Sequence, residues 1–343
     1  MRGNSTTLAK SYTTPRTLRA YDALPGNPFS IGIGFTVVLI LIFIVGRILF
    51  AGASTSTPDE LRVAISQILM TTYCASAYAY LLMSARKTTL ELAPVAQTDP
   101  QWQTIVARAG KHRTWALLLT GAASYLIVGV AVTNATTAEP TNPWYWQGWT
   151  YDVVWHRATT VFFVWWLACL CYCIVVESLR LSRLSDNIEV LDLLELRPYR
   201  PLVRQGLTNA LLVIGTVSVL SLLGVESRYW QILVGFWVMF TALAWVGMML
   251  PLRGMRRKIR SAKEKELDWC RQRLKDSRDA LKCGAAERQS IAEIMAYTRM
   301  IENIRNWPFD NPTLVRFTLY LLIPLGSWLG GAFVERGLDF FLS

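Results

Sequence analysis

The residues best suited to chemistry lie in the last long apolar segment of the chain, positions 314–340. Small or polar side chains recur there at i, i+4, i+7, i+11 and i+15, which places them on one face of an α-helix. They are Tyr320, Pro324, Ser327, Gly331 and Glu335. In a membrane helix, such a stripe ending in a carboxylate is typical of a pore wall with an acidic ring that attracts cations. Tight helix packing also selects Gly and Ser, so packing remains an alternative.

A second candidate site is the connection 134–156, which is rich in aromatic residues and contains no Lys or Arg. Its members include Trp144, Trp146, Trp149, Tyr151 and Trp155. Such residues can form a recess for a cationic or planar ligand, because a cation is attracted to the face of an aromatic ring. An aromatic belt lying at the membrane interface explains the same composition.

Arg47 is the third candidate, because it follows sixteen uncharged residues, Ile31 to Gly46. A charge within the membrane costs roughly 3 kcal/mol or more and therefore marks a candidate pore or substrate site. The alternative is that the long side chain extends to the headgroups.

Sequence patterns typical of catalytic sites are scarce. The two histidines, His112 and His156, lie at the ends of different apolar segments, and the chain lacks phosphate-binding Gly loops and zinc-protease motifs. Cys169 and Cys173 would share a helix face, as a soft-metal site requires, but the sequence favours small packing residues in a membrane helix because no His, and no Cys other than Cys171, lies near them in the chain. The sequence predicts no enzyme, no cofactor and no metal site.

The elements that carry these residues follow from composition. Of the 343 residues, 52% are hydrophobic and only 17% are charged, whereas soluble domains average about 25% charged residues. Apolar blocks of about 20 residues, each long enough to cross roughly 30 Å of hydrocarbon, lie at 30–51, 62–84, 114–134, 157–178, 207–225, 230–251 and 314–340. They predict an all-α, polytopic membrane protein with seven transmembrane helices.

The basic residues predict its orientation. Thirty of the 35 Lys and Arg residues fall in alternate connections, 1–29, 85–113, 178–206 and 252–316. The positive-inside rule then places the N-terminus inside and the C-terminus outside, in a plasma (inner) membrane. The net charge of +11 indicates contact with anionic lipid headgroups, worth ~1 kcal/mol per residue near the surface. No nucleic-acid-binding motif accompanies it.

The predicted organisation includes large cytoplasmic extensions. In chain order it comprises a tail (1–29), helices one to four (30–178), an amphipathic helix with a Pro-rich turn (179–206), helices five and six (207–251), a basic helical hairpin (252–313) and helix seven (314–343). Apolar residues between Met255 and Leu281 recur at roughly heptad spacing, as in a coiled coil. This stripe requires a partner, which is either the 179–196 helix or another subunit.

Several segments of the C-terminal half resemble uncharacterised prokaryotic multi-pass membrane proteins. They are Arg204–Leu207, Pro251–Lys263, Trp307–Asp310 and Ile323–Trp328, and the resemblance implies no particular function. The topology is similar to that of insect odorant and gustatory receptors, seven-helix channels with an inside N-terminus and a cytoplasmic anchor. That similarity is architectural, since their C-terminal Thr-Tyr…Gln-Phe signature is absent, and it implies a tetrameric pore lined by helix seven.

These observations favour an oligomeric ion channel or channel-like membrane sensor with its pore along the last helix. The first alternative is a membrane scaffold or signalling protein that docks a cytoplasmic partner through residues 252–306. A secondary transporter ranks third, because transporters of that class are built from internal repeats and the chain shows none.

Overall fold

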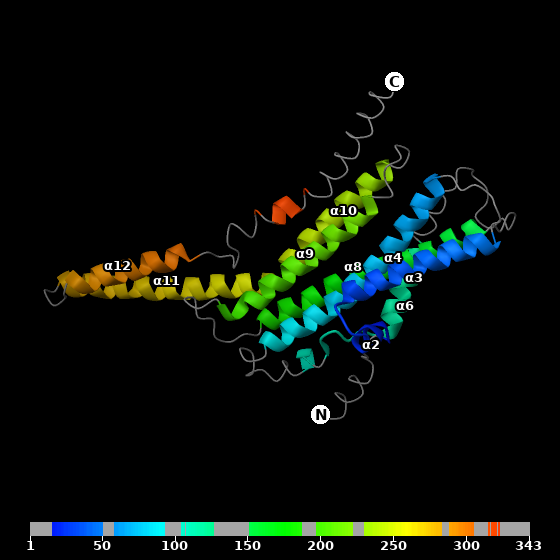
Figure 1. The fold of residues 1–343 in the computed structure, drawn as a ribbon. Helices are drawn as coiled ribbons and strands as arrows, with labels where there is room; N and C mark the ends of the chain where they lie inside the picture. The colour runs from blue at the N-terminus through cyan, green and yellow to red at the C-terminus, as the bar shows by residue number, and fades with distance from the viewer. Residues whose placement is uncertain are drawn as a thin grey trace, which may run out of the picture.

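The computed structural model describes residues 16–50, 58–92, 104–106, 108–126, 151–186, 197–221, 230–282, 288–304, 315, 317–320 and 322, and these residues are helical apart from turns and short links (Figure 1). Within them, four helices are long and apolar enough to cross a membrane, or five if the bent pair α10–α11 forms one span. The chain is thus an all-helical protein with the apolar helices of a multi-pass membrane protein.

The helices follow the apolar blocks closely. They are α2 (Arg16–Ala23), α3 (Pro28–Phe50), α4 (Pro58–Leu92), α6 (Thr114–Ser124), α8 (Tyr151–Asp186), the 3₁₀ turn η3 (Arg197–Tyr199), α9 (Arg200–Leu220), α10 (Trp230–Met249), α11 (Arg253–Lys282) and α12 (Arg288–Asn303). Helix α6 covers only the start of the third block. For the seventh block, helix is described only within 315–322.

Prolines set several helix boundaries. Helix α3 begins at Pro28, whose missing N–H costs nothing in a first turn, and the Asn27 side chain accepts a 3.4 Å hydrogen bond from the Phe29 N–H. Pro251 falls between α10 and α11, where a ring without an N–H interrupts the helical ladder. The chain therefore bends by 45° there and continues as α11.

From α3 to α10, helices that follow one another along the chain alternate in direction, so α4 and α8 are parallel neighbours while α9 is antiparallel to α4. Helices α4 and α8 run the same way, since Gln67 is bonded to Thr160 and Tyr78 lies 5.5 Å from Trp166 by ring centroids. Helix α9 runs opposite to α4, because residue 73 contacts residue 212 while Ser84 contacts Gln205. The end of α4, the start of α6, the end of α8 and the start of α9 consequently lie at the same end of the bundle.

Buried side chains form two main cores. The first, here called the membrane core, lies between α4, α8, α9 and α10 and includes Tyr78, Leu170, Ile174 and Phe240. The second, here called the junction cluster, contains mainly aliphatic residues from α4, α8, α9, α10, α11 and α12, together with Tyr199 and Phe317. Most of it belongs to what we call the junction layer, residues 84–92, 177–186, 197–210 and 252–262. Its buried members include Leu92, Leu184, Leu202 and Ile259.

The start of α3 gives the depth of the junction layer. Phe29 packs against Tyr73 and Tyr80, so α3 begins beside the middle of α4. From Tyr80 to Leu92, α4 extends about 18 Å farther at 1.5 Å per residue. The junction layer therefore lies beyond the level at which the apolar helix α3 begins.

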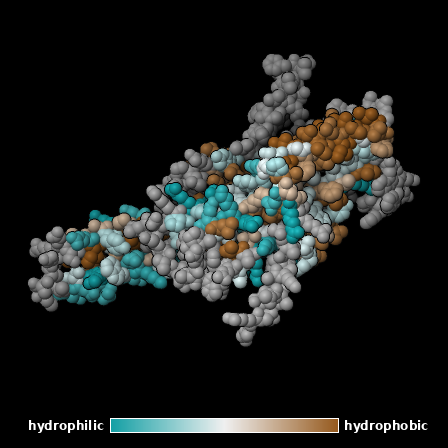
Figure 2. Space-filling view, turned by 60° about the horizontal axis from the view of Figure 1, so that its bottom comes forward, coloured by the Kyte–Doolittle hydropathy of each residue, from teal (hydrophilic) through white to brown (hydrophobic). Residues whose placement is uncertain are grey.

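Helix α3 has the surface expected of a lipid-facing helix. Only 6% of its most apolar stretch is buried inside the protein. Figure 2 shows hydrophobic side chains gathered over the end of the molecule that contains α3, and hydrophilic ones over much of the opposite end. The sequence predicts a cytoplasmic tail at residues 1–29, whereas α2 within this segment buries Leu18 and Tyr21 in the membrane core. Burial raises the pKa of the Tyr21 phenol, and its hydrogen bond to Ser76 partly offsets that effect.

Helices α11 and α12 pair into a hairpin that extends away from the bundle (Figure 1). Cys270 and Ile301 are buried, and the rings of Trp269 and Tyr297 meet edge-on at 6.3 Å. The Lys263 ammonium donates hydrogen bonds to the carbonyls of Glu302 and Ile304. Two partners therefore cover the α11 stripe: α12 along the hairpin, and the end of α8, whose Leu181 and Leu184 share a cluster with Met255 and Ile259.

Candidate functional site

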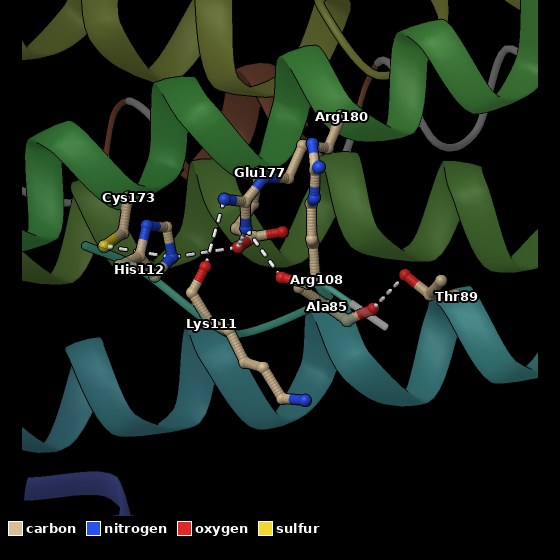
Figure 3. A network of polar contacts seen from close by, with 8 residues as sticks. All are labelled: Ala85, Thr89, Arg108, Lys111, His112, Cys173, Glu177 and Arg180. Carbon is tan, nitrogen blue, oxygen red and sulfur yellow. Dashed lines mark hydrogen bonds and ion pairs between the residues drawn. The ribbon is translucent and has the colours of Figure 1, made fainter. Parts of the chain in front are cut away.

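The most concentrated set of polar side chains joins α8 to the turn before α6 (Figure 3). Glu177 is buried, and its Oε1 lies 2.9 Å from Nε2 of His112 and 2.6 Å from Nη1 of Arg180. The side chains of His112 and Glu177 are 0% and 2% exposed, whereas that of Arg180 is 18% exposed. The Cys173 sulfur lies 3.7 Å from the same histidine nitrogen. We call these four residues the Glu177 cluster.

A tight turn brings His112 to α8. Gly110 has a φ of +67°, a conformation that favours glycine, and the Lys111 N–H donates to the Arg108 carbonyl at 2.9 Å. The Arg180 guanidinium then donates to the carbonyls of both Arg108 and Lys111 at 3.0 Å. Arg180 thus holds the turn and Glu177 simultaneously.

The geometry constrains the protons of the cluster. With Nε2 of His112 protonated, the imidazole donates to the Glu177 carboxylate. Nδ1 of His112 is buried without a hydrogen-bond partner among the described residues. The imidazole of His112 and the guanidinium of Arg180 therefore hold the Glu177 carboxylate from two sides.

A network of amide and hydroxyl groups continues from this cluster across the bundle. The Gln205 carbonyl oxygen accepts hydrogen bonds from Ser84 at 2.7 Å and Thr88 at 3.2 Å, and its amide donates to Asn209 at 2.8 Å. The Asn209 amide donates in turn to Ser178, the residue after Glu177, and to the carbonyl of Gly247. This network connects α4, α8, α9 and α10 at the level of the junction layer.

A smaller polar cluster lies at the opposite end of α4 and α8. The Gln67 carbonyl oxygen is 2.9 Å from Nδ1 of His156 and accepts a 2.8 Å hydrogen bond from Thr159. Its amide donates to Thr160 at 3.3 Å. The groups that meet in these contacts are an amide, two hydroxyls and an imidazole. We call this set the Gln67 cluster.

Of the proposed pore residues, the structure describes only Tyr320. It is half-buried and packs beside the junction cluster, one turn after Phe317, which is 1% exposed. The Phe317 ring lies 6.4 Å from that of Trp245 on α10. Pro324, Ser327, Gly331 and Glu335 lie outside the described residues, so the pore stripe remains a prediction.

The proposed ligand recess is described only in part. Tyr151 and Trp155 stack at 6.1 Å and pack against Phe43 of α3, and the Tyr151 hydroxyl donates to α3 carbonyls at 3.3 Å. Trp144, Trp146 and Trp149 lie outside the described residues. Arg47 is half-buried in the last turn of α3, next to Gly46, whose Cα approaches the Tyr151 ring. Both roles remain predictions.

The sequence patterns do not predict the Glu177 cluster, and of its four members they single out only His112 and Cys173. The i, i+3 spacing of Glu177 and Arg180 was a usable signal for an ion pair on one helix face. No local spacing connects His112 to them, because the contact depends on how α6 and α8 pack.

Among the residues that the structure describes, no group of three or more His, Cys, Asp or Glu side chains is placed to hold a metal ion. In comparisons with known proteins, no family model matches the chain, and no curated protein or solved structure matches it. The arrangement of the described residues is therefore the basis for the function proposed below.

Proposed function

We propose that the protein is a seven-helix membrane sensor of the channel type. In this proposal the N-terminus lies inside and the C-terminus outside. Identical subunits form an oligomer whose pore is lined by the last helix of each subunit. The cytoplasmic hairpin and the junction layer control that helix. The shared location of the basic helix ends supports this orientation, since the segments 84–92, 108–113, 177–186 and 197–204 gather at one end of the bundle.

One observation carries the proposal. Phe317, one turn before Tyr320, is buried in the same cluster as Leu184 at the end of α8 and Ile259 in α11. The first turn of the proposed pore helix is thereby packed on the elements that hold the hairpin. Because a packed cluster resists gradual deformation and tends to rearrange as a whole, a displacement of the hairpin is transmitted to the pore helix.

The root of the hairpin, residues 253–262, is fixed firmly enough to transmit such a displacement. A side chain at Gly254 would collide with Ser182 and Ser185 of α8, so only glycine permits this close approach. Arg257 donates a 2.7 Å hydrogen bond to Asp186 beside it. Helix α11 thus begins in direct backbone contact with α8.

The test is to measure oligomeric state and current on the purified full-length chain. The proposal predicts an oligomer that conducts cations in planar bilayers. Glu335→Gln should reduce cation conductance, and Glu335→Lys should abolish it or favour anions, because carboxylates around a narrow mouth concentrate cations. Ser327→Leu should block the path by bulk, whereas Leu329→Met, off the stripe, should conduct like the parent. A monomer without conductance contradicts the proposal.

A second candidate is the scaffold that docks a cytoplasmic protein through the hairpin. It is favoured by large side chains that the hairpin leaves exposed, Trp269, Met295 and Met300, together with Arg273, whose guanidinium lies 5.7 Å from the Trp269 ring. Exposed aromatic and Met side chains are enriched at protein interfaces. Capture by the wild-type hairpin that is lost in the Trp269→Ala and Met300→Ala variants, with no conductance from the full chain, would favour this function.

A further inference from the structure

A cavity rich in arginine lies between α8 and the segment that leads into α6. Its volume is about 460 Å³. Its lining includes four basic and two aromatic side chains, Arg108, Arg113, Trp115, Tyr172, Arg180 and Arg183. Arg180 is held in place by the Glu177 cluster, so one wall of the cavity is fixed.

The described lining of this cavity is basic, because it contains four arginines and no acidic residue. The described segments around it, 104–106, 108–126 and 172–186, contain two acids, Glu177 and Asp186. Glu177 is bonded to His112 and Arg180, and Asp186 to Arg257. In these segments the basic side chains therefore outnumber the acidic ones.

Its depth matches that of lipid headgroups. Helix α3 begins beside Tyr73 and Tyr80 of α4, and Tyr78 in turn packs against Trp166 of α8. The cavity residues on α8, from Tyr172 to Arg183, lie roughly two to five turns beyond that level. Trp115 is 56% exposed at the start of α6, and the exposed side chains of Leu118 and Leu119 continue into the apolar region. The site therefore has a basic end and an apolar end, as an amphiphile requires.

We propose that this cavity binds the phosphate headgroup of one anionic phospholipid, whose acyl chains lie along the exposed apolar face of α6. Guanidinium groups match phosphate oxygens in geometry and charge and are its preferred protein ligands. Tryptophan favours the membrane interface. Basic pockets between transmembrane helices on the cytoplasmic side bind anionic headgroups. Binding is a property of the purified chain, so this site stands whether or not the protein conducts ions.

The experiment titrates the detergent-purified full chain with phosphatidylglycerol and with phosphatidylcholine of the same acyl chains, and counts bound lipids by native mass spectrometry. The test variant is Arg113→Gln/Arg183→Gln, which leaves Arg180 and its structural contacts intact. At ~1 kcal/mol per charge, the first phosphatidylglycerol should bind about thirty-fold more weakly to this variant. Arg183→Gln alone, a change at an exposed side chain, should weaken binding about five-fold. Phosphatidylcholine binding should not change.

The matched control is Arg86→Gln/Lys87→Gln, which removes two exposed charges of α4 that do not line this cavity. The control should bind phosphatidylglycerol like the parent. Equal weakening in the two double variants would mean that binding follows overall charge and would overturn the site. Displacement of the lipid by millimolar inorganic phosphate would overturn the lipid assignment, because the acyl chains would then contribute nothing.

Discussion

The membrane core and the junction layer are held together by different interactions. In the membrane core, several hydroxyl groups return to their own helix, as with Thr72 to the Ile68 carbonyl and Thr216 to the Leu212 carbonyl. In the junction layer, polar side chains bridge helices: Gln205 joins α9 to α4, and Glu177 joins α8 to the turn at His112. The second region contains the buried ion pair.

The difference shows where the relative positions of the helices are determined. Inside a bilayer the hydrophobic effect does not draw helices together, because lipid is as apolar as their side chains. The proposed topology places the junction layer beyond the apolar stretch of α3, where burial of Leu202 and Ile259 would remove apolar surface from water. We therefore expect the junction layer to contribute more per buried residue than the membrane core.

The largest expected effect is that of Glu177→Gln. Removing one partner of a buried ion pair costs roughly 3–5 kcal/mol, and we expect a loss at the lower end of that range because Arg180 is 18% exposed and keeps its bonds to two carbonyls. Gln67→Leu in the Gln67 cluster is the control, because hydrogen bonds between membrane helices average about 0.6 kcal/mol each. Unfolding by SDS titration in mixed micelles measures both. A loss at Glu177 no greater than that at Gln67 would remove the distinction between the two regions.

Identical truncations in the two cores give the next largest effect. Leu202→Ala in the junction layer should cost about 2–5 kcal/mol, the sum of a lost transfer free energy and a cavity. Leu170→Ala in the membrane core is equally buried, but its unfolded reference remains in lipid, so the loss should be smaller by about 1.5–3 kcal/mol. The same titration compares them. Equal losses would show that both cores lie in the same kind of surroundings.

A pair of glycine substitutions tests the close contact between α9 and α10. A Cβ at Gly206 would lie 2.7 Å from the Met248 carbonyl oxygen, so Gly206→Ala forces the backbones apart and should cost about 1–3 kcal/mol. Gly34→Ala on α3 has nothing within 4 Å of its Cβ and should leave stability unchanged or slightly raised. Thermal unfolding midpoints in detergent suffice. Tolerance at Gly206 would contradict the packing of α9 on α10.

The smallest effect is expected at the exposed pair between the hairpin root and α8. Asp186→Asn removes the partner of Arg257, and both side chains are substantially exposed. Such pairs contribute about 0.2–1 kcal/mol and are weakened by salt. The unfolding free energy of the variant should be lower than that of the parent by this amount at low salt. The difference between the two should be smaller at high salt. A loss as large as that of Glu177→Gln would mean that the hairpin root depends mainly on this pair.

Much of the helical fold follows from the sequence, because a chain in lipid must satisfy its backbone hydrogen bonds within helices. The apolar blocks at 30–51 and 157–178 indicate α3 and α8, and Pro251 marks the bend before α11. Helix α2 was missed because it is short and polar, and it is held by tertiary contacts of Leu18 and Tyr21. The His112–Glu177 contact was also not predicted, because it depends on tertiary packing between segments far apart in the sequence.

Hydrogen–deuterium exchange in lipid nanodiscs tests most directly the central claim that the junction layer is one cooperative unit linking the membrane helices to the hairpin. If it is, its segments open together, and Glu177→Gln should accelerate exchange of the slowest amides at 108–116, 177–186 and 253–260 by a common factor of about a hundred or more. Asp186→Asn should change each segment about five-fold or less. Acceleration confined to 108–116 and 177–186, with 253–260 unchanged, would contradict the claim.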